Sequence, residues 1–388
     1  MGVTYVTGRA GSGKTEYILR EAKAAVHAGK RVLVVTPELM TLSMEQALLA
    51  DLPVLWNLEV LSPSRLQAKL RQELGGSDAV MLDDAGRAMA LRAVWTQLKD
   101  GLSYYTSMSG GFLERLVSQI KELRAGELGA TGLRLAADSL AEGVTRDKLY
   151  DLAAILDGYE RFMAGKYMDG EDAADRFCAA AHHSRWLRDA HVFVDGFDVL
   201  PLKTCRMFLA LCKACKSVTL SFRTDSGFGR DAELFAPVQE GYECLHRMVL
   251  QQGLAWTKID LRPRQKGEPS LDHLERELFA RPAVAYAKTP EGLELAALHD
   301  GELEAERAAG ALEGWMRRDG LSPEEVAVVC QEPQAYAGAL ERAFARRGLR
   351  LYVDDPQGCA FHPAARYLLS ALQAVRRGYA QEDMIRCM

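Results

Sequence analysis

The sequence predicts an α/β fold in which helices cover a parallel sheet, and three observations support this class. A glycine-rich run stands between a strand-like segment and a helix-like segment near the amino terminus. Apolar runs of strand length then recur along the chain, separated by segments of helical periodicity, as in sheets covered on both faces. From about residue 75 to residue 186 the periodicity is helical, with no convincing strand. The length of 388 residues is enough for two or three buried cores.

The glycine-rich run fits the phosphate-binding pattern G-x-x-x-x-G-K-[ST]. Glycines allow backbone N–H groups to converge on a β-phosphate, while Lys14 would reach the β- and γ-phosphates and the Thr15 hydroxyl would ligate Mg²⁺. Residues 3–7 alternate like a strand and residues 16–27 are periodic like a helix, which is the context that a P-loop requires. An ordinary glycine turn before a helix is the alternative. The predicted ATP-binding residues are Gly8, Arg9, Ala10, Gly11, Ser12, Gly13, Lys14 and Thr15.

The remaining elements follow the same plan. Ser62 and Pro63 predict the capped start of a helix. In the first α/β part, strands are expected at 31–36, 58–61, 191–194 and 217–222, and helices at 41–50, 64–74, 201–215 and 240–251. Between them, helices are expected at 84–98, 111–124, 146–166 and 171–182. After a linker at 262–269, strands are expected at 293–298, 326–330 and 349–353, and helices at 302–317, 334–347, 363–376 and 381–388.

This pattern predicts one domain interrupted by another. Residues 1–74 and 187–285 would form a first α/β domain, and residues 75–186 an all-α insertion. Residues 290–388 would begin a second α/β domain. Because the last helix stops without a cap or a tail, we expect the chain to be part of a longer protein.

A carboxylate that could hold Mg²⁺ follows the strand at 191–194. It is Asp195, which we predict as a metal ligand together with Thr15. Many ATPases place a water-activating glutamate next, where this chain has Gly196. A positioned general base contributes roughly 10²–10⁴-fold to a rate, so we expect ATP binding with slow or absent hydrolysis. Glu171, Asp172 and Asp198 could replace the base, although no spacing favours them.

Composition and missing motifs exclude several classes. The net charge of −5 gives no overall attraction to nucleic acid, so any DNA-binding surface must be local. No apolar run approaches the ~20 residues of a membrane span, and we expect a cytoplasmic protein without a membrane partner. A GTPase would carry N-K-x-D, which is absent, and a small-molecule kinase would be complete in about one domain. Cys205, Cys212 and Cys215 are expected on a buried helix face, and His182, His183 and His191 at the surface or in packing.

The chain resembles the AddB family, the B subunit of the AddAB (RexAB) helicase–nuclease that processes double-strand DNA ends in bacteria. The resemblance rests on the P-loop, residues 35–46 (VTPELMTLSMEQ), 62–66 (SPSRL) and 193–197 (FVDGF), in this order. Further matches lie at residues 232–235, 302–307, 326–329, 352–355 and 362–363. It implies a superfamily 1 helicase fold with a RecA-type core, a degenerate motor in this subunit, and a partner A subunit (AddA) that drives translocation.

The resemblance also implies a path for single-stranded DNA and recognition of the recombination hotspot Chi. Hydroxyls and backbone amides would contact phosphates, and an arginine would contact a phosphate or a base edge. Ordinary loop and cap chemistry is the alternative for the same residues. Leu39 and Ala68 stand where a polar and an aromatic residue are expected, and Gln331 where an arginine near the γ-phosphate is usual. The predicted DNA-contacting residues are Thr36, Pro37, Thr41, Ser62 and Arg65.

Members of the family are longer and carry a carboxy-terminal nuclease with a cysteine-bound iron–sulfur cluster. Neither a G-x-x-D-R-x-D run nor the cluster cysteines are identifiable here, so we expect both only in the family's carboxy-terminal part. Three functional hypotheses stay open. The first is a nucleotide-binding, DNA-gripping subunit in which ATP is a conformational latch. The others are an active helicase or ATPase, and a structural partner of the motor that has lost nucleotide binding.

Overall fold

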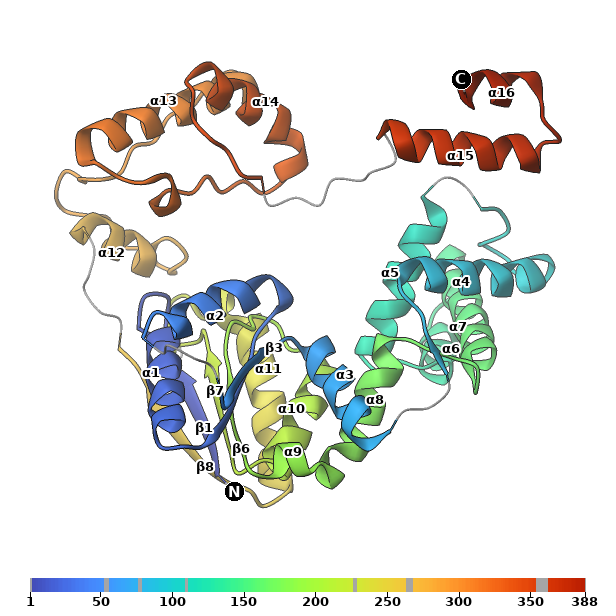
Figure 1. Cartoon of the computed structure of the whole chain (residues 1–388), viewed down its shortest axis with the longest axis horizontal. Coiled ribbons are helices and arrows are strands. Elements are labelled where there is room, and N and C mark those ends of the chain that lie inside the picture. Colours follow the sequence, from blue (N-terminus) through green and yellow to red (C-terminus); the bar gives the residue numbers. More distant parts are fainter. Residues whose placement is uncertain are drawn as a thin grey trace. The chain divides into compact units, whose positions relative to one another are not determined.

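The computed structural model of the chain describes residues 2–51, 56–75, 79–108, 111–225, 229–262, 268–353 and 362–387. They form two compact units, Met1–Leu293 and Glu294–Met388 (Figure 1). Most of the expected linker at 262–269 lies outside the described residues, as do residues 354–355 of the family resemblance. Among the described helices, none combines the length and the apolar character needed to cross a membrane.

The first unit is organised by a six-stranded sheet in which every strand pair is parallel, in the order β3-β2-β6-β7-β1-β8. The α/β class and all five predicted strands of this part are confirmed. The sequence pattern missed β8, because this edge strand is largely exposed and has no buried apolar run. The strands are β1 Gly2–Thr7, β2 Arg31–Val35, β3 Leu58–Leu61, β6 Ala190–Val194, β7 Ser217–Phe222 and β8 Ala255–Asp260.

Helices cover both faces of the sheet, because successive strand residues point to opposite sides. On one face Val32 and Val34 pack with α1 and α2, and on the other Leu33 and Val35 pack with α3, α10 and α11. The helix predictions in this part are confirmed, as is the burial of the three cysteines of α10 and its end, Cys205, Cys212 and Cys215. The helices are α1 Lys14–His27, α2 Thr41–Leu49, α3 Pro63–Leu74, α9 Arg185–Arg188, α10 Leu202–Ala214, α11 Ala232–Gln251 and α12 Pro269–Glu277.

A helical region stands between β3 and β6 and has its own core, formed by side chains such as Leu91, Leu116, Leu133 and Leu156. The expectation of an all-α segment is wrong in one detail, because β4 (Val80–Met81) pairs in parallel with β5 (Tyr167–Met168). Strands of two residues are too short to produce a periodic pattern. The short helix α6 was also not predicted. The helices are α4 Asp84–Leu98, α5 Phe112–Ala125, α6 Ala130–Asp138, α7 Val144–Met163 and α8 Gly170–Ala180.

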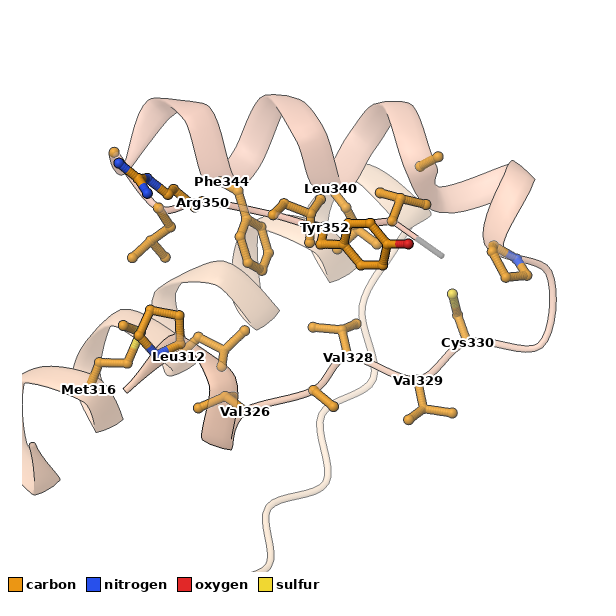
Figure 2. Close-up of a pocket in the computed structure, with 18 residues that line it drawn as sticks. Leu312, Met316, Val326, Val328, Val329, Cys330, Leu340, Phe344, Arg350 and Tyr352 are labelled. Atoms are coloured by element: carbon orange, nitrogen blue, oxygen red, sulfur yellow. The ribbon is translucent and has the colours of Figure 1, made fainter. Parts of the chain in front are cut away.

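The second unit contains the four predicted helices, but the strands expected at 293–298, 326–330 and 349–353 are wrong: the described residues there form no strand. Residues 326–330 and 349–353 instead line an apolar cavity of about 690 Å³ with α13 and α14 (Figure 2). Val329 is among the lining residues, although it is 92% exposed. A strand requires a hydrogen-bonding neighbour, which an apolar run does not supply by itself. The helices are α13 Gly301–Asp319, α14 Pro333–Arg346, α15 Pro363–Arg376 and α16 Gln381–Cys387.

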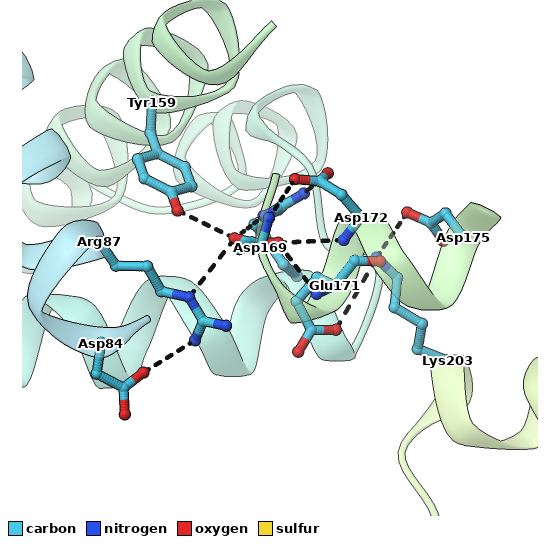
Figure 3. A network of polar contacts seen from close by, with 9 residues as sticks. Asp84, Arg87, Tyr159, Asp169, Glu171, Asp172, Asp175 and Lys203 are labelled. Atoms are coloured by element: carbon cyan, nitrogen blue, oxygen red, sulfur yellow. Dashed lines mark hydrogen bonds and ion pairs between the residues drawn. The ribbon is translucent and has the colours of Figure 1, made fainter. Parts of the chain in front are cut away.

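A buried carboxylate joins the helices of the first unit (Figure 3). Asp169 caps α8 by accepting hydrogen bonds from the backbone N–H groups of Glu171 at 3.0 Å and Asp172 at 3.1 Å. Tyr159 of α7 donates its hydroxyl to the same carboxylate at 3.0 Å, and Arg124 of α5 forms an ion pair with it. Burial alone raises the pKa of Asp169, but Arg124 and the hydrogen bonds lower it below its ordinary value.

The same network reaches the helix that packs on the sheet. Lys203 of α10 is buried and contacts Asp175 of α8 at 2.9 Å and the backbone carbonyl of Glu171 at 3.2 Å (Figure 3). A buried cation is stable only when it has hydrogen-bond or ion-pair partners. The contact of Lys203 therefore holds α8 and α10 in fixed positions relative to each other. The network around Asp169 therefore connects the helical region to the sheet.

Replacement of Asp169 by alanine is expected to lower the free energy of unfolding by about 3–5 kcal/mol, because Arg124 keeps only Asp172 as an ion-pair partner among the described residues, α8 loses its cap and the buried Tyr159 hydroxyl loses its acceptor. The measurement is urea unfolding of both proteins at neutral pH. The folded pKa of Asp169 is depressed, so this contribution is present above the unfolded value of 3.8 and is lost as the pH falls through the folded pKa. Asp157→Ala is the control, since Asp157 forms an exposed pair with Arg134. Equal effects of the two substitutions would contradict the assignment.

Candidate functional site

The carboxyl ends of parallel strands meet at one edge of the sheet, where ligands of such folds usually bind. In the strand order, β7 lies between β1 and β6, so the segments that follow these three strands are neighbours. They enclose a cavity of about 550 Å³. Its lining comes from the loop after β1 and the start of α1, from the segments after β2 and β6, and from the end of β7: Ala10, Gly11, Gly13, Lys14, Thr15, Glu16, Met40, Asp195, Gly196, Phe197, Asp198, Ser221 and Arg223.

The loop after β1 has a shape that requires its glycines. Gly11 and Gly13 have φ angles of 71° and 84°, in the left-handed region that favours glycine. A Cβ on Gly8 would lie 2.7 Å from the carbonyl oxygen of Leu261, which is closer than packing allows. Gly13 is also the residue before α1, so the unpaired N–H groups and the positive dipole end of this helix lie at the cavity. These N–H groups and the positive end of the helix dipole can bind an anion.

Lys14 lies within this loop. Its Nζ donates hydrogen bonds to the backbone carbonyls of Gly8 and Arg9, both at 2.7 Å. Burial, and then the nearby positive charge of Arg223, lower the pKa of Lys14 to about 8, although Asp195 and Asp198 partly oppose the shift. An anion in the cavity would therefore stabilise the ammonium form of Lys14.

Asp195 follows β6 and is only 3% exposed. Its Oδ1 accepts a hydrogen bond from the hydroxyl of Ser221, and its Oδ2 is buried without a hydrogen-bond partner among the described residues. A carboxylate oxygen in this state is costly unless a cation or a donor is supplied. Thr15 lines the same cavity. One carboxylate and one hydroxyl suit Mg²⁺, which takes its other ligands from water and phosphate, and the described residues contain no cluster of three or more His, Cys, Asp or Glu side chains for a metal.

The position after Asp195 favours glycine over glutamate. Gly196 has a φ angle of 86°, in the left-handed region, and a Cβ there would lie 2.6 Å from Sδ of Met40 and 3.2 Å from Cδ of Pro37. The flexible Met40 side chain could move aside, so the positive φ angle is the main structural reason for glycine at this position. Three other carboxylates were named in the sequence analysis as possible replacements for the missing base. Asp198 lines the cavity and pairs with Arg223 at 3.2 Å. Glu171 and Asp172 belong instead to the network around Asp169.

Arg9, predicted within the ATP-binding run, directs its side chain elsewhere. The guanidinium pairs with Asp231 at 2.6 Å, Glu275 at 3.0 Å and Asp225 at 3.2 Å, and lies 4.9 Å from the ring centroid of Phe235. Burial lowers the pKa of Arg9, but hydrogen bonds to the three carboxylates raise it above its ordinary value. The side chain therefore holds the loop against α11 and α12, and only its backbone can face a ligand. Ser12 of the same run is buried.

The predicted DNA-contacting residues also follow strands of this edge. Thr36 follows β2 and is fully buried, with no hydrogen-bond partner for its hydroxyl among the described residues. The hydroxyl of Ser62 accepts from the backbone N–H of Arg65 at 3.4 Å and caps α3, as predicted, and Thr41 donates to the carbonyl of Glu38 at 2.9 Å. The Arg65 side chain is exposed and pairs with Glu38 at 3.0 Å.

Pro37 follows Thr36 in the segment between β2 and α2 and packs toward Gly196. Of the five predicted DNA-contacting residues, Arg65 has the exposed charged side chain. Thr36, Thr41 and Ser62 are buried, so they would contact a DNA strand only through backbone groups or after a local movement.

Met40, Ser221 and Arg223 line the cavity but were not predicted as site residues. No motif includes Ser221 or Arg223, and Met40 lies in the segment 35–46 of the family resemblance without a role assigned to it. The signal for Ser221 and Arg223 is the two-residue period of β7, which places both side chains on one face at the end of a strand next to β1. Met40 could not be found, because its contact with Gly196 joins segments that are far apart in the chain.

Comparison with known proteins adds independent information. A curated protein of Symbiobacterium thermophilum, named as the B subunit of an ATP-dependent helicase/deoxyribonuclease, is 30% identical over 404 residues, covering 98% of this chain and 35% of that protein. The proteins of the same name from Moorella thermoacetica and Bacillus subtilis are 30% and 26% identical, over 410 and 407 residues, covering 100% of this chain and 35% of each relative. The chain thus spans about a third of the length of these relatives.

A family model described as "ADDB, N-terminal" matches residues 5–275, which include the sheet, the helical region and the whole cavity. The match covers well over half of the 388 residues. It agrees with the resemblance that the P-loop and the segments after β2, β3 and β6 carry. The chain belongs to the AddB family, of which it contains the amino-terminal part.

Proposed function

We propose that this chain is the nucleotide-binding and DNA-contacting portion of the B subunit of an ATP-dependent helicase/deoxyribonuclease. The observation that carries the proposal is that Lys14 and Asp195 line one cavity beside a glycine loop, and that Oδ2 of Asp195 has no hydrogen-bond partner in the described part of the chain. Lys14 would pair with phosphate, and Asp195 would need a cation, so together they suit a magnesium nucleotide. The fold would then be a P-loop core of RecA type. The second RecA-like domain has no support from strands in the described part of residues 294–388.

The residues at the cavity fit ATP and Mg²⁺ in the following way. Backbone N–H groups of residues 11–15 would receive the β-phosphate, and Lys14 would leave the carbonyls of Gly8 and Arg9 for the β- and γ-phosphates. Asp195 and Thr15 would hold Mg²⁺, whose charge neutralises that of the phosphates when it is bound. The Arg9 side chain keeps the loop in place from outside the cavity.

We propose further that ATP serves as a conformational latch in this chain, with little hydrolysis. Gly196, whose φ angle of 86° favours glycine, stands after Asp195 where a base would be. Without a positioned base, the rate falls by about 10²–10⁴-fold while the binding groups stay intact. Asp198 lies at the cavity, but it is paired with Arg223.

The relatives' names support a wider role. They are named as subunits of an ATP-dependent helicase/deoxyribonuclease, so we propose that the whole protein acts on DNA ends in the bacterial cytoplasm, in double-strand break repair. A second, AddA-type subunit would drive translocation in a heterodimer. The emerging single strand would cross the edge near Thr36, Pro37, Thr41, Ser62 and Arg65, where Arg65 offers an exposed cation.

Lys14→Ala is expected to weaken ATP binding by about tenfold to a hundredfold, because a charge-assisted contact to phosphate is lost. The measurement is equilibrium titration of the 388-residue chain with Mg·ATP, with and without single-stranded DNA. Lys30→Ala, at an exposed lysine outside the cavity, is the control. Unchanged affinity in Lys14→Ala would contradict the proposal. Absent binding in the unsubstituted chain would favour the structural partner, and brisk DNA-stimulated turnover would favour the active helicase.

The affinity for ATP is also expected to fall as the pH rises above 8. The pKa of Lys14 in the free protein is about 8, and only the ammonium form pairs with phosphate, so binding above this pH requires proton uptake. The dissociation constant should rise by up to about tenfold per pH unit between pH 8 and 10. In Lys14→Arg, whose guanidinium stays charged, any remaining affinity should be flat over this range. A pH profile shared by both proteins would exclude Lys14 as the source.

Arg65→Ala is expected to weaken binding of single-stranded DNA and to lower the slope of log affinity against log salt by about 0.7, the value for one phosphate contact. Fluorescence anisotropy at several salt concentrations measures both quantities. Arg134→Ala is the matched control, since Arg134 is also an exposed arginine in an ion pair, with Asp157 at 3.0 Å. An equal change in the two variants would count against a DNA path at Arg65.

A further inference from the structure

The end of β7 carries a cation that none of the motifs includes. Phe222 is buried in the sheet's core, while Ser221 and Arg223 on either side of it both line the cavity. Ser221 donates its hydroxyl to Asp195, so the end of β7 is fixed beside the carboxylate that would hold Mg²⁺. Because β7 lies between β1 and β6, Arg223 enters the cavity between the loop and Asp195.

Arg223 has a replaceable partner. It pairs with Asp198 at 3.2 Å, with 55% and 54% of the two side chains exposed. Exposed ion pairs contribute little to stability, so this pair can be exchanged at small cost. A phosphate is the better partner, because it carries more charge and accepts the planar guanidinium at two oxygens.

Two cations lie at one cavity of about 550 Å³, Lys14 from the loop after β1 and Arg223 from the end of the neighbouring strand β7. Arg223 is one of the causes of the lowered pKa of Lys14, so the two charges repel each other in this structure. An anion between them would remove that repulsion. Among the residues that the structure describes, Oδ2 of the buried Asp195 at the same cavity has no hydrogen-bond partner, which is a separate indication that a cation and its anionic ligand belong here.

We propose that Arg223 is a specificity-determining residue that leaves Asp198 and binds the terminal phosphate of a nucleoside triphosphate. The inference rests on the proposed function, in which the loop of residues 8–15 binds the nucleotide. The loop and the start of α1 receive the β-phosphate, whereas Arg223 comes from the side of Asp195, where the metal and the γ-phosphate would lie. Arg223 therefore distinguishes a triphosphate from a diphosphate. When it leaves Asp198, the segment after β6 loses this ion pair, so the contacts of that segment differ between the bound and the free state.

The test is competition of Mg·ATP and Mg·ADP against a fluorescent ADP analogue, with the complete 388-residue chain. We expect Arg223→Ala to weaken ATP binding by about tenfold and ADP binding by less than twofold, and Arg223→Lys to recover part of the loss. Asp198→Asn, which frees Arg223, should tighten ATP binding and leave ADP unchanged. Arg20→Ala is the matched control, because Arg20 is an exposed arginine of α1 paired with Glu21 outside the cavity.

The ratio of the two affinities decides the outcome. If Arg223→Ala changes neither nucleotide, or weakens both equally, the inference is wrong while the proposed nucleotide site stands. If Asp198→Asn weakens ATP binding, the partner exchange is wrong. If the unsubstituted chain binds neither nucleotide, the proposed function fails and the inference fails with it. Circular dichroism and urea midpoints of all variants show whether a loss reflects unfolding.

Discussion

The parallel alignment of β1, β7 and β6 is the constraint on which the rest of the structure depends. Parallel pairing places the ends of all three strands at one edge, and the strand order places the loop after β1 and Asp195 on either side of β7. No local feature of the chain brings Lys14 near Asp195, since about 180 residues separate them. The sheet does so, and the helices packed on its two faces bury the strands that hold this edge in place.

Two groups of contacts then determine what the cavity can do. The pairing of Arg9 with Asp225, Asp231 and Glu275 fixes the loop from behind, so its glycine conformation does not depend on a ligand. The positive φ angle of Gly196 favours glycine where a catalytic base would stand. A preformed glycine loop without a base after Asp195 suits the binding of a nucleotide more than its turnover, and for this reason we propose a latch.

The sequence predicted those parts that depend on neighbours in the chain. The glycine loop, the capped start of α3 at Ser62 and the buried strands all arise from local pattern and burial. The parts it missed depend on distant partners. Arg9 resembled a loop residue because its acidic partners lie more than 200 residues away, and Met40 is recognisable only through Gly196. Residues 326–330 and 349–353 are apolar runs of strand length, but they have no neighbouring strand in the described structure. Conversely, β8 is a strand although it lacks a buried apolar run.

We propose that one magnesium nucleotide binds to this cavity and stays intact. A single calorimetric titration of the unsubstituted chain with Mg·ATP, followed by assay of inorganic phosphate in the same sample, tests this directly. We predict saturable binding of one ATP per chain, loss of that binding when Mg²⁺ is chelated, and no phosphate beyond the background within the titration. Absence of binding, or release of many phosphates per chain in that time, would contradict it.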